Sequence, residues 1–145
     1  MDLKKKAAFL LQYSRMKERM LILLERRKAY ESDIYGIKAT SYSDEPKGGG
    51  LPTGLDTKVI KLLTVSEDID KELADLTVKM EYIRTVITRL TNYKYRSLLE
   101  LKYIDGMTTK QIESILNCSH TNLMVNNKKA LKALPLEETD LDNVL

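Results

Sequence analysis

The sequence contains few of the residues that build metal sites and nucleophilic active sites. Its 145 residues include one cysteine, Cys118, one histidine, His120, and no tryptophan. One cysteine cannot form a disulfide within the chain, and the two residues together cannot supply the several ligands of a zinc site. The acidic residues also stand in no motif for acid–base or two-metal chemistry. We therefore expect a protein that is not an enzyme and holds no metal or cofactor.

Long apolar runs and aromatic residues are also scarce. No stretch of about 20 apolar residues is present, so we expect no membrane span and no membrane partner. A single cysteine suits the reducing cytoplasm. Aromatic residues are 6% of the chain although hydrophobic residues are 43%, so most of the apolar content is Leu, Ile, Val and Met. These residues suit helix packing, and the composition predicts an all-α fold.

Residues 1–35 have the pattern of a basic amphipathic helix. Apolar residues recur there at alternating steps of four and three, and only Arg27 interrupts them. This spacing places one apolar stripe along one side of a helix. The members of the stripe are Phe9, Tyr13, Met16, Met20, Leu23, Tyr30 and Ile34.

Residues 36–56 follow with a run of Gly, Pro and Ser that predicts a flexible loop.

A second long helix is predicted over residues 57–91. Ten positions keep a heptad spacing there, and Ser66 is the single polar member. Such a stripe is typical of a helix that packs along another helix over its whole length. The two long helices therefore predict a coiled-coil hairpin within one chain or a homodimer of two chains. The stripe consists of Val59, Leu62, Ser66, Ile69, Leu73, Leu76, Met80, Ile83, Ile87 and Leu90.

Residues 92–135 predict a small domain of short helices. A first helix ends near Gly106, which suits a left-handed terminator. Thr108 and Gln111 have the spacing of a capping box, and Ser119 is an N-cap residue type that opens the last helix before Pro135. Two short helices joined by about three residues have the outline of a helix-turn-helix.

The charge is distributed unevenly along the chain. The formal net charge is +3, residues 1–35 hold many of the lysines and arginines, and every charged residue of 136–145 is acidic. We expect this acidic tail to be disordered, because a short, highly charged segment buries little apolar surface.

The segment from Thr91 to Leu134 resembles region four of bacterial sigma factors. The resemblance lies in Met107-Thr108 at the start of a helix, in inward-facing Ile112 and Leu116, in the Ser119 cap, and in the Lys128-to-Leu134 tail. The basic first helix, the motif at Ala39–Gly48 and this tail together resemble small phage proteins of Gram-positive bacteria. Those proteins are described as late transcriptional regulators of the ArpU type. The resemblance implies a phage protein that acts in transcription in the cytoplasm of a bacterial host.

The final helix has two groups of candidate DNA contacts. Leu123 should turn inward, so that the outer side chains face the major groove and the cations and helix starts face phosphates. The candidates for base reading are His120, Thr121, Asn122, Met124, Val125 and Lys128. The candidates for phosphate binding are Thr108, Lys110, Ser119, Lys129 and Lys132.

Three positions depart from the sigma pattern. Glu113 replaces a small residue and should lie at the rim of the helix crossing, and Asn117 replaces a turn glycine. Asn126 falls where the family has a buried aliphatic residue, so either this amide finds a partner or the helix is rotated. Arginines that would read guanine are absent from residues 118–134.

The expected function is that of a transcriptional regulator that binds double-stranded DNA through its C-terminal helices. Host RNA polymerase or another host protein is a further candidate partner. A second hypothesis is a protein-binding module or inhibitor that uses the same helices to bind a host protein such as RNA polymerase or a nuclease. A third is a small terminase subunit, although that class usually has its helix-turn-helix before the coiled coil.

Overall fold

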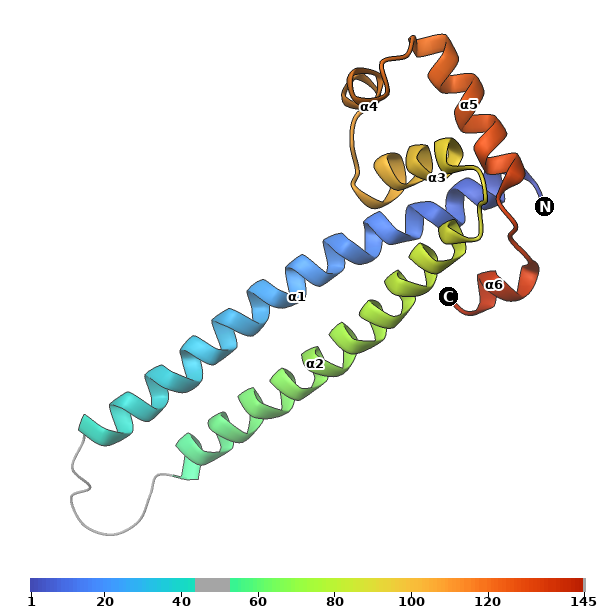
Figure 1. The fold of residues 1–145 in the computed structure, drawn as a ribbon. Coiled ribbons are helices and arrows are strands. Elements are labelled where there is room, and N and C mark those ends of the chain that lie inside the picture. Colours follow the sequence, from blue (N-terminus) through green and yellow to red (C-terminus); the bar gives the residue numbers. More distant parts are fainter. Residues whose placement is uncertain (44–52, 145) are drawn as a thin grey trace. The chain divides into compact units, whose positions relative to one another are not determined.

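The computed structural model describes the backbone of residues 1–43 and 53–144, and the side chains of residues 1–33 and 57–144. The described chain is all-helical, with no strand in those ranges. The long helices come first and the short ones follow (Figure 1). The elements are α1 (Leu3–Ser43), α2 (Thr53–Thr88), α3 (Tyr93–Leu99), the π-helix η1 (Glu100–Ile104), α4 (Thr109–Leu116), α5 (His120–Ala133) and α6 (Glu138–Asp142).

The chain divides into two compact units. Unit 1 consists of residues 1–18 and 77–145, and unit 2 consists of residues 19–76. Unit 1 therefore includes α3 to α6 with the start of α1 and the end of α2. None of the helices in the described ranges is long and apolar enough to cross a membrane.

Unit 2 is built on paired segments of α1 and α2. Arg19 Nε lies 2.8 Å from Glu72 Oε1, and Arg27 Nη1 lies 3.3 Å from Asp70 Oδ1. Later residues of α1 thus pair with earlier residues of α2, so the two segments run antiparallel. Arg27, the interruption in the predicted stripe, is half-buried and also bonds Glu31 Oε1, 3.2 Å away. Two carboxylates therefore neutralise the charge of Arg27 at the edge of the interface between the two segments.

The two predicted stripes are the inward faces of α1 and α2. Every predicted member whose side chain is described is buried or half-buried. Ile34 lies outside the described side chains. This agreement follows from the helical period of 3.6 residues, which keeps positions three and four apart on one side.

The boundaries of the predicted loop differ from the structure. α1 continues to Ser43 and α2 begins at Thr53, so residues 36–43 and 53–56 are helical; residues 44–52 of that prediction lie outside the described residues. The reason is that no proline occurs between Leu3 and Pro46. A helix that has already formed adds further residues at little cost, and one glycine lowers its stability by only about 1 kcal/mol.

α3 passes directly into η1. The backbone N–H of Asp105 donates to the carbonyl of Glu100 at 2.9 Å, a five-residue spacing that defines a π turn. Gly106 then takes a left-handed conformation with φ of 65°, and the backbone N–H of Met107 donates back to Leu101 at 3.0 Å. The predicted terminator at Gly106 is confirmed, because a residue without Cβ adopts this φ freely.

The C-terminal segment is folded, and our expectation of a disordered tail was wrong. α6 lies within unit 1, and the carboxylate of Asp140 is only 4% exposed. It accepts hydrogen bonds from Tyr82 Oη at 2.5 Å, from Arg89 at 2.9 and 3.2 Å, and from the backbone N–H of Glu137 at 2.8 Å. The tail is ordered because Asp140 receives all of these hydrogen bonds, and because Leu136 and Val144 of the same segment are buried.

These donors set the ionisation of Asp140. Burial alone would raise the pKa of this carboxyl, but the hydrogen bonds from Arg89, Tyr82 and Glu137 outweigh it and lower the pKa from 3.8 to about 2. Asp140 is therefore charged at neutral pH.

A buried lysine closes the end of α5. Lys6, on α1, is 8% exposed, and its Nζ donates to the carbonyls of Lys132 at 3.2 Å and of Leu134 at 2.7 Å. The last carbonyls of a helix have no partner within it and carry partial negative charge. The Lys6 ammonium supplies both a donor and the complementary charge.

Candidate nucleic-acid interface

α4 begins and ends as the sequence predicts. Thr108 Oγ1 accepts from the backbone N–H of Gln111 at 3.3 Å, and Gln111 Oε1 accepts from the backbone N–H of Thr108 at 3.0 Å. Asn117 ends the helix in a left-handed conformation with φ of 50°. Asparagine tolerates this conformation better than most residues. It therefore replaces the turn glycine.

α5 begins at His120, three residues after Asn117. Ser119 Oγ accepts from the backbone N–H of Asn122 at 3.1 Å, which confirms Ser119 as the N-cap. The helix ends at Ala133, and Leu134 leaves the helical conformation immediately before Pro135. A residue before proline disfavours the helical region, so Pro135 ends the helix.

A small apolar cluster holds α4 and α5 on α3. It consists of Leu98 from α3, Ile112 from α4 and Leu123 from α5, each at most 5% exposed. Met107 and Leu116 pack against it, as does the half-buried Cys118 in the connection between the two helices. The position of α5 within unit 1 is therefore set by packing.

The outer face of α5 is open to solvent. All six residues of the base-reading hypothesis lie there and are exposed, with Met124 at 43% and Val125 at 45%. The five residues of the phosphate hypothesis are also exposed, on the starts of α4 and α5 and along α5. The opposite face of α5 is buried. All eleven candidates are therefore accessible to solvent.

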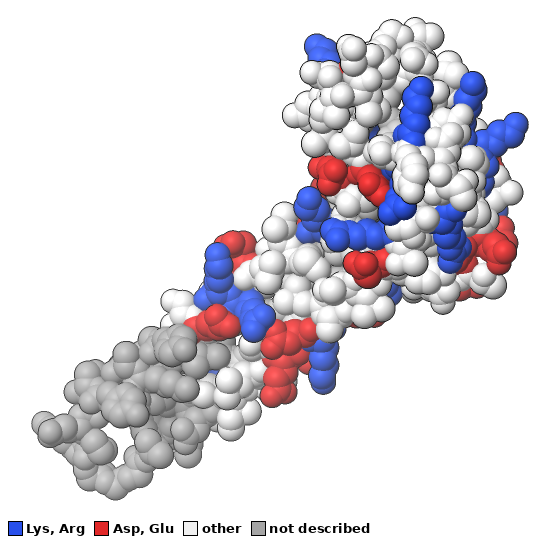
Figure 2. Space-filling view, in the orientation of Figure 1, with Lys and Arg blue, Asp and Glu red and all other residues white. Residues whose placement is uncertain are grey.

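The charged side chains of α5 itself are all positive. No acidic residue occurs between Glu113 and Glu137. Lys128, Lys129 and Lys132 are exposed on α5, and blue side chains project from that part of the molecule in Figure 2. A surface of this kind attracts phosphates.

Glu113 lies at the rim of the pair of helices, as its position predicts. Its side chain is 23% exposed, and Oε1 lies 2.9 Å from Nδ1 of His120 at the start of α5. This contact joins α4 to α5 next to their connection. It also engages one of the six base-reading candidates.

Asn126 keeps its place in the buried face of α5 and has a partner. It is 9% exposed, and its Nδ2 donates to Oδ1 of Asn122 at 3.1 Å. The helix is therefore not rotated to expose this amide. The sequence did not identify Asn122 as this partner, although the spacing of four residues is the one at which helical side chains meet.

Asn127 is a second buried amide on α5. It is 9% exposed, and its Oδ1 has no hydrogen-bond partner among the described residues. Its side chain bonds Tyr103 of η1. Burial raises the pKa of that tyrosine, and the bond to Asn127 opposes part of the rise. No sequence pattern pointed to this contact, because the two residues are far apart in the chain.

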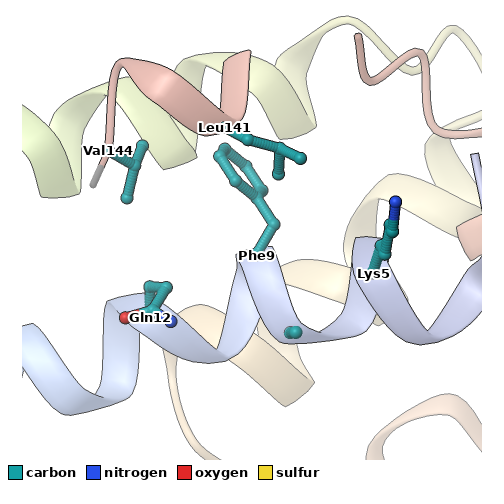
Figure 3. Close-up of a pocket in the computed structure, with 6 residues that line it drawn as sticks. Lys5, Phe9, Gln12, Leu141 and Val144 are labelled. Atoms are coloured by element: carbon teal, nitrogen blue, oxygen red, sulfur yellow. The ribbon is translucent and has the colours of Figure 1, made fainter. Parts of the chain in front are cut away.

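A pocket of about 240 Å³ lies between the start of α1 and the C-terminal segment in unit 1. Phe9, Leu141 and Val144 supply most of its wall, with Lys5 and Gln12 at its edge (Figure 3). Its polar residues form no acid–base pair. Within the described part of the chain, no three His, Cys, Asp or Glu side chains are placed to hold a metal ion.

The chain belongs to the family described as "Protein of unknown function (DUF1492)", whose profile matches residues 37–135. The match includes α2 to α5 and therefore the whole candidate interface. Neither the curated proteins nor the solved structures contain a significant match to the chain.

Proposed function

We propose that this member of the DUF1492 family is a DNA-binding transcriptional regulator of phage origin that acts in the bacterial cytoplasm. In this proposal α4 and α5 form a helix-turn-helix related in outline to sigma factor region four. α5 is the recognition helix that enters the major groove of double-stranded DNA. Late-gene regulators of the ArpU type are the functional class that the sequence resembles.

One observation carries the proposal. α5 is held by the Leu98, Ile112 and Leu123 cluster, and its opposite face is exposed, basic and free of acidic residues. That face combines an amide at Asn122, apolar groups at Met124 and Val125, and an ammonium at Lys128. Such groups can bond adenine edges, contact thymine methyl groups and bind phosphates.

The long helices supply the body of the proposed regulator. We propose that α1 and α2 form a coiled-coil hairpin and that the protein is a homodimer. Exposed apolar residues in unit 2 support the second point, because a pair of helices has only one seam in which to bury them. They are Leu21, Ile22, Leu24, Ile60 and Leu63. Light scattering on the full chain measures the oligomeric state, and a monomer at micromolar concentration would contradict the dimer.

Salt dependence of DNA binding tests the function. The full chain is mixed with a pool of random duplexes, the enriched duplex is labelled, and its Kd is measured by fluorescence anisotropy at several salt concentrations. We expect Kd to rise steeply with salt, because each phosphate contact releases a counterion. Lys129→Ala should lower the slope of log Kd against log salt by about 0.9 if Lys129 contacts a phosphate.

The matched control is Lys61→Ala, which removes an exposed lysine of α2 in unit 2. It lowers the net charge by the same amount and should leave the slope unchanged. Equal slopes for both variants would place the DNA contact elsewhere. Failure of the wild-type chain to bind any duplex would reject the proposal.

A protein-binding module is the second candidate function. The specific observation in its favour is that Ile115, Met124 and Val125 are 43–55% exposed while residues 118–134 contain no arginine. In this alternative the surface binds a host protein such as RNA polymerase or a nuclease. A pull-down from lysate that recovers one protein after nuclease treatment, and loses it when Met124 and Val125 become Ser, would favour it over DNA binding.

A further inference from the structure

We propose that Asn126 is a positioning residue that fixes the side chain of Asn122 for reading an adenine in the major groove. This inference rests on the proposed DNA-binding function and names the base that one position of the surface recognises. It follows from the hydrogen bond between two asparagines one helical turn apart on α5.

Asn122 is held at two points. Its backbone N–H donates to Ser119 Oγ at 3.1 Å, and its side-chain Oδ1 accepts from Asn126 Nδ2 at 3.1 Å. Asn126 itself is 9% exposed and therefore has little freedom to move. The exposed amide of Asn122 is thus fixed near the start of α5, where recognition helices contact base edges.

The hydrogen bond leaves the reading groups of Asn122 available. An amide oxygen has two lone pairs, and Asn126 uses one of them. The second lone pair can accept from N6 of adenine while Nδ2 donates to N7. The bond also fixes which side of the amide is the acceptor. Guanine presents acceptors at both N7 and O6, so the fixed oxygen would face another acceptor there.

An apolar side chain at position 126 could not supply this bond. Of the other four buried residues of α5, Leu123, Ala130 and Leu131 are apolar and the fourth is Asn127. A leucine at position 126 would extend the apolar face without burying a polar group. A role in packing alone would therefore be served better by an aliphatic side chain. The feature that distinguishes Asn126 is its donor to Asn122.

The experiment compares base preference in the wild type and in Asn126→Leu. Each protein selects from a pool of duplexes with a randomised central segment, and Kd is then measured for the selected duplex with each of the four base pairs at the adenine position. We expect a wild-type preference of about tenfold for adenine, within the range of a bidentate contact. Asn126→Leu should reduce it about threefold at that position alone, because Asn122 regains three staggered χ1 rotamers.

Three further variants make the result specific. Asn122→Ala should abolish the preference, and adding Asn126→Leu to it should change nothing more. Asn127→Leu replaces the other buried asparagine of α5, which has no bond to Asn122 among those described, and should leave base preference intact. Circular dichroism confirms that each variant is folded.

An unchanged base preference in Asn126→Leu, or an equal loss of affinity for all four duplexes, would overturn the positioning role while leaving the proposed function in place. If the wild type binds no duplex, the proposed function fails and this inference fails with it.

Discussion

The two units of the molecule are stabilised in different ways. Unit 1 buries apolar residues on α1, α2, α3, α4 and α5, and it also buries Lys6 and Asp140, each of which is hydrogen-bonded within the unit. In unit 2 the buried apolar residues among the described side chains are Leu23, Ile69 and Leu76. A bundle of short helices can enclose a core from several sides, whereas two paired helical segments bury apolar side chains only along the one interface between them. The comparison indicates that the candidate interface belongs to the better enclosed unit.

The units also differ in charge. Unit 1 holds 15 Lys and Arg against 10 Asp and Glu, a formal charge of +5. Unit 2 holds 9 against 11, a formal charge of −2. The total of +3 for the chain therefore conceals a basic unit and a weakly acidic one. A phosphate-rich partner would be attracted to unit 1.

The largest difference should appear when one leucine is truncated in each unit. Leu98→Ala, in the cluster beneath α4 and α5, should lower the free energy of unfolding by about 3 kcal/mol, because it leaves a cavity. Leu63→Ala, at a position 47% exposed in unit 2, should change the free energy of unfolding by less than about 0.5 kcal/mol when both are measured at a dilution where the chain is monomeric. Urea unfolding followed by circular dichroism measures both. Similar losses would show that unit 2 has an apolar interface of its own at Leu63.

Removing the charge of Asp140, which accepts hydrogen bonds from Tyr82 and Arg89, should give the next largest effect. Its pKa is lower in the folded chain than in the unfolded chain, so its contribution is present above about pH 4 and is lost as pH falls toward 2. Asp140→Asn should lower the free energy of unfolding by about 2 kcal/mol at pH 7. The gap between variant and wild type should close near pH 2. A gap that stays constant with pH would mean that the shift in pKa does not stabilise unit 1.

The Lys6 contact should have a smaller effect. Lys6→Met keeps the length of the side chain and removes the donor to the carbonyls of Lys132 and Leu134, so unfolding should become easier by about 1.5 kcal/mol. Lys5→Met is the control, because the side chain of Lys5 is 61% exposed and lies 4.0 Å from Glu138. Thermal unfolding should separate the two variants, and equal melting temperatures would contradict a role for Lys6 as a cap.

The ion pair between Arg19 and Glu72 should contribute least. Hydrogen bonding to Glu72 raises the pKa of Arg19, and the bond to Arg19 lowers the pKa of Glu72, but both side chains are about 40% exposed. Water and salt screen such a pair. A double-mutant cycle with Arg19→Ala and Glu72→Ala should detect a weak coupling that disappears in concentrated salt. A coupling that survives high salt would show that unit 2 depends on this pair.

Local patterns predicted much of the candidate interface. The capping box at Thr108, the N-cap at Ser119 and the left-handed residues at Gly106 and Asn117 were all predicted and are confirmed. Each depends on groups within a few residues of one another. The placement of Glu113 at the rim was predicted for the same reason, from its distance along α4.

Contacts between distant residues were not predictable. Asp140 lies in a segment that reads as a charged tail, and its donors Tyr82 and Arg89 are more than fifty residues away. The burial of Lys6 depends on where α5 ends. Nothing near these residues in the sequence marks their partners.

The sequence by itself determined that α1 to α5 are helical, where α4 and α5 start and stop, and which faces of α1, α2 and α5 turn inward, because hydrophobic periodicity and capping act over one or two turns. Only the tertiary structure decided that the acidic segment is ordered, that Lys6 closes α5, and that Asn126 bonds Asn122 instead of turning outward. Those outcomes depend on the cost of burying a polar group, which is known only once the neighbouring groups are in place.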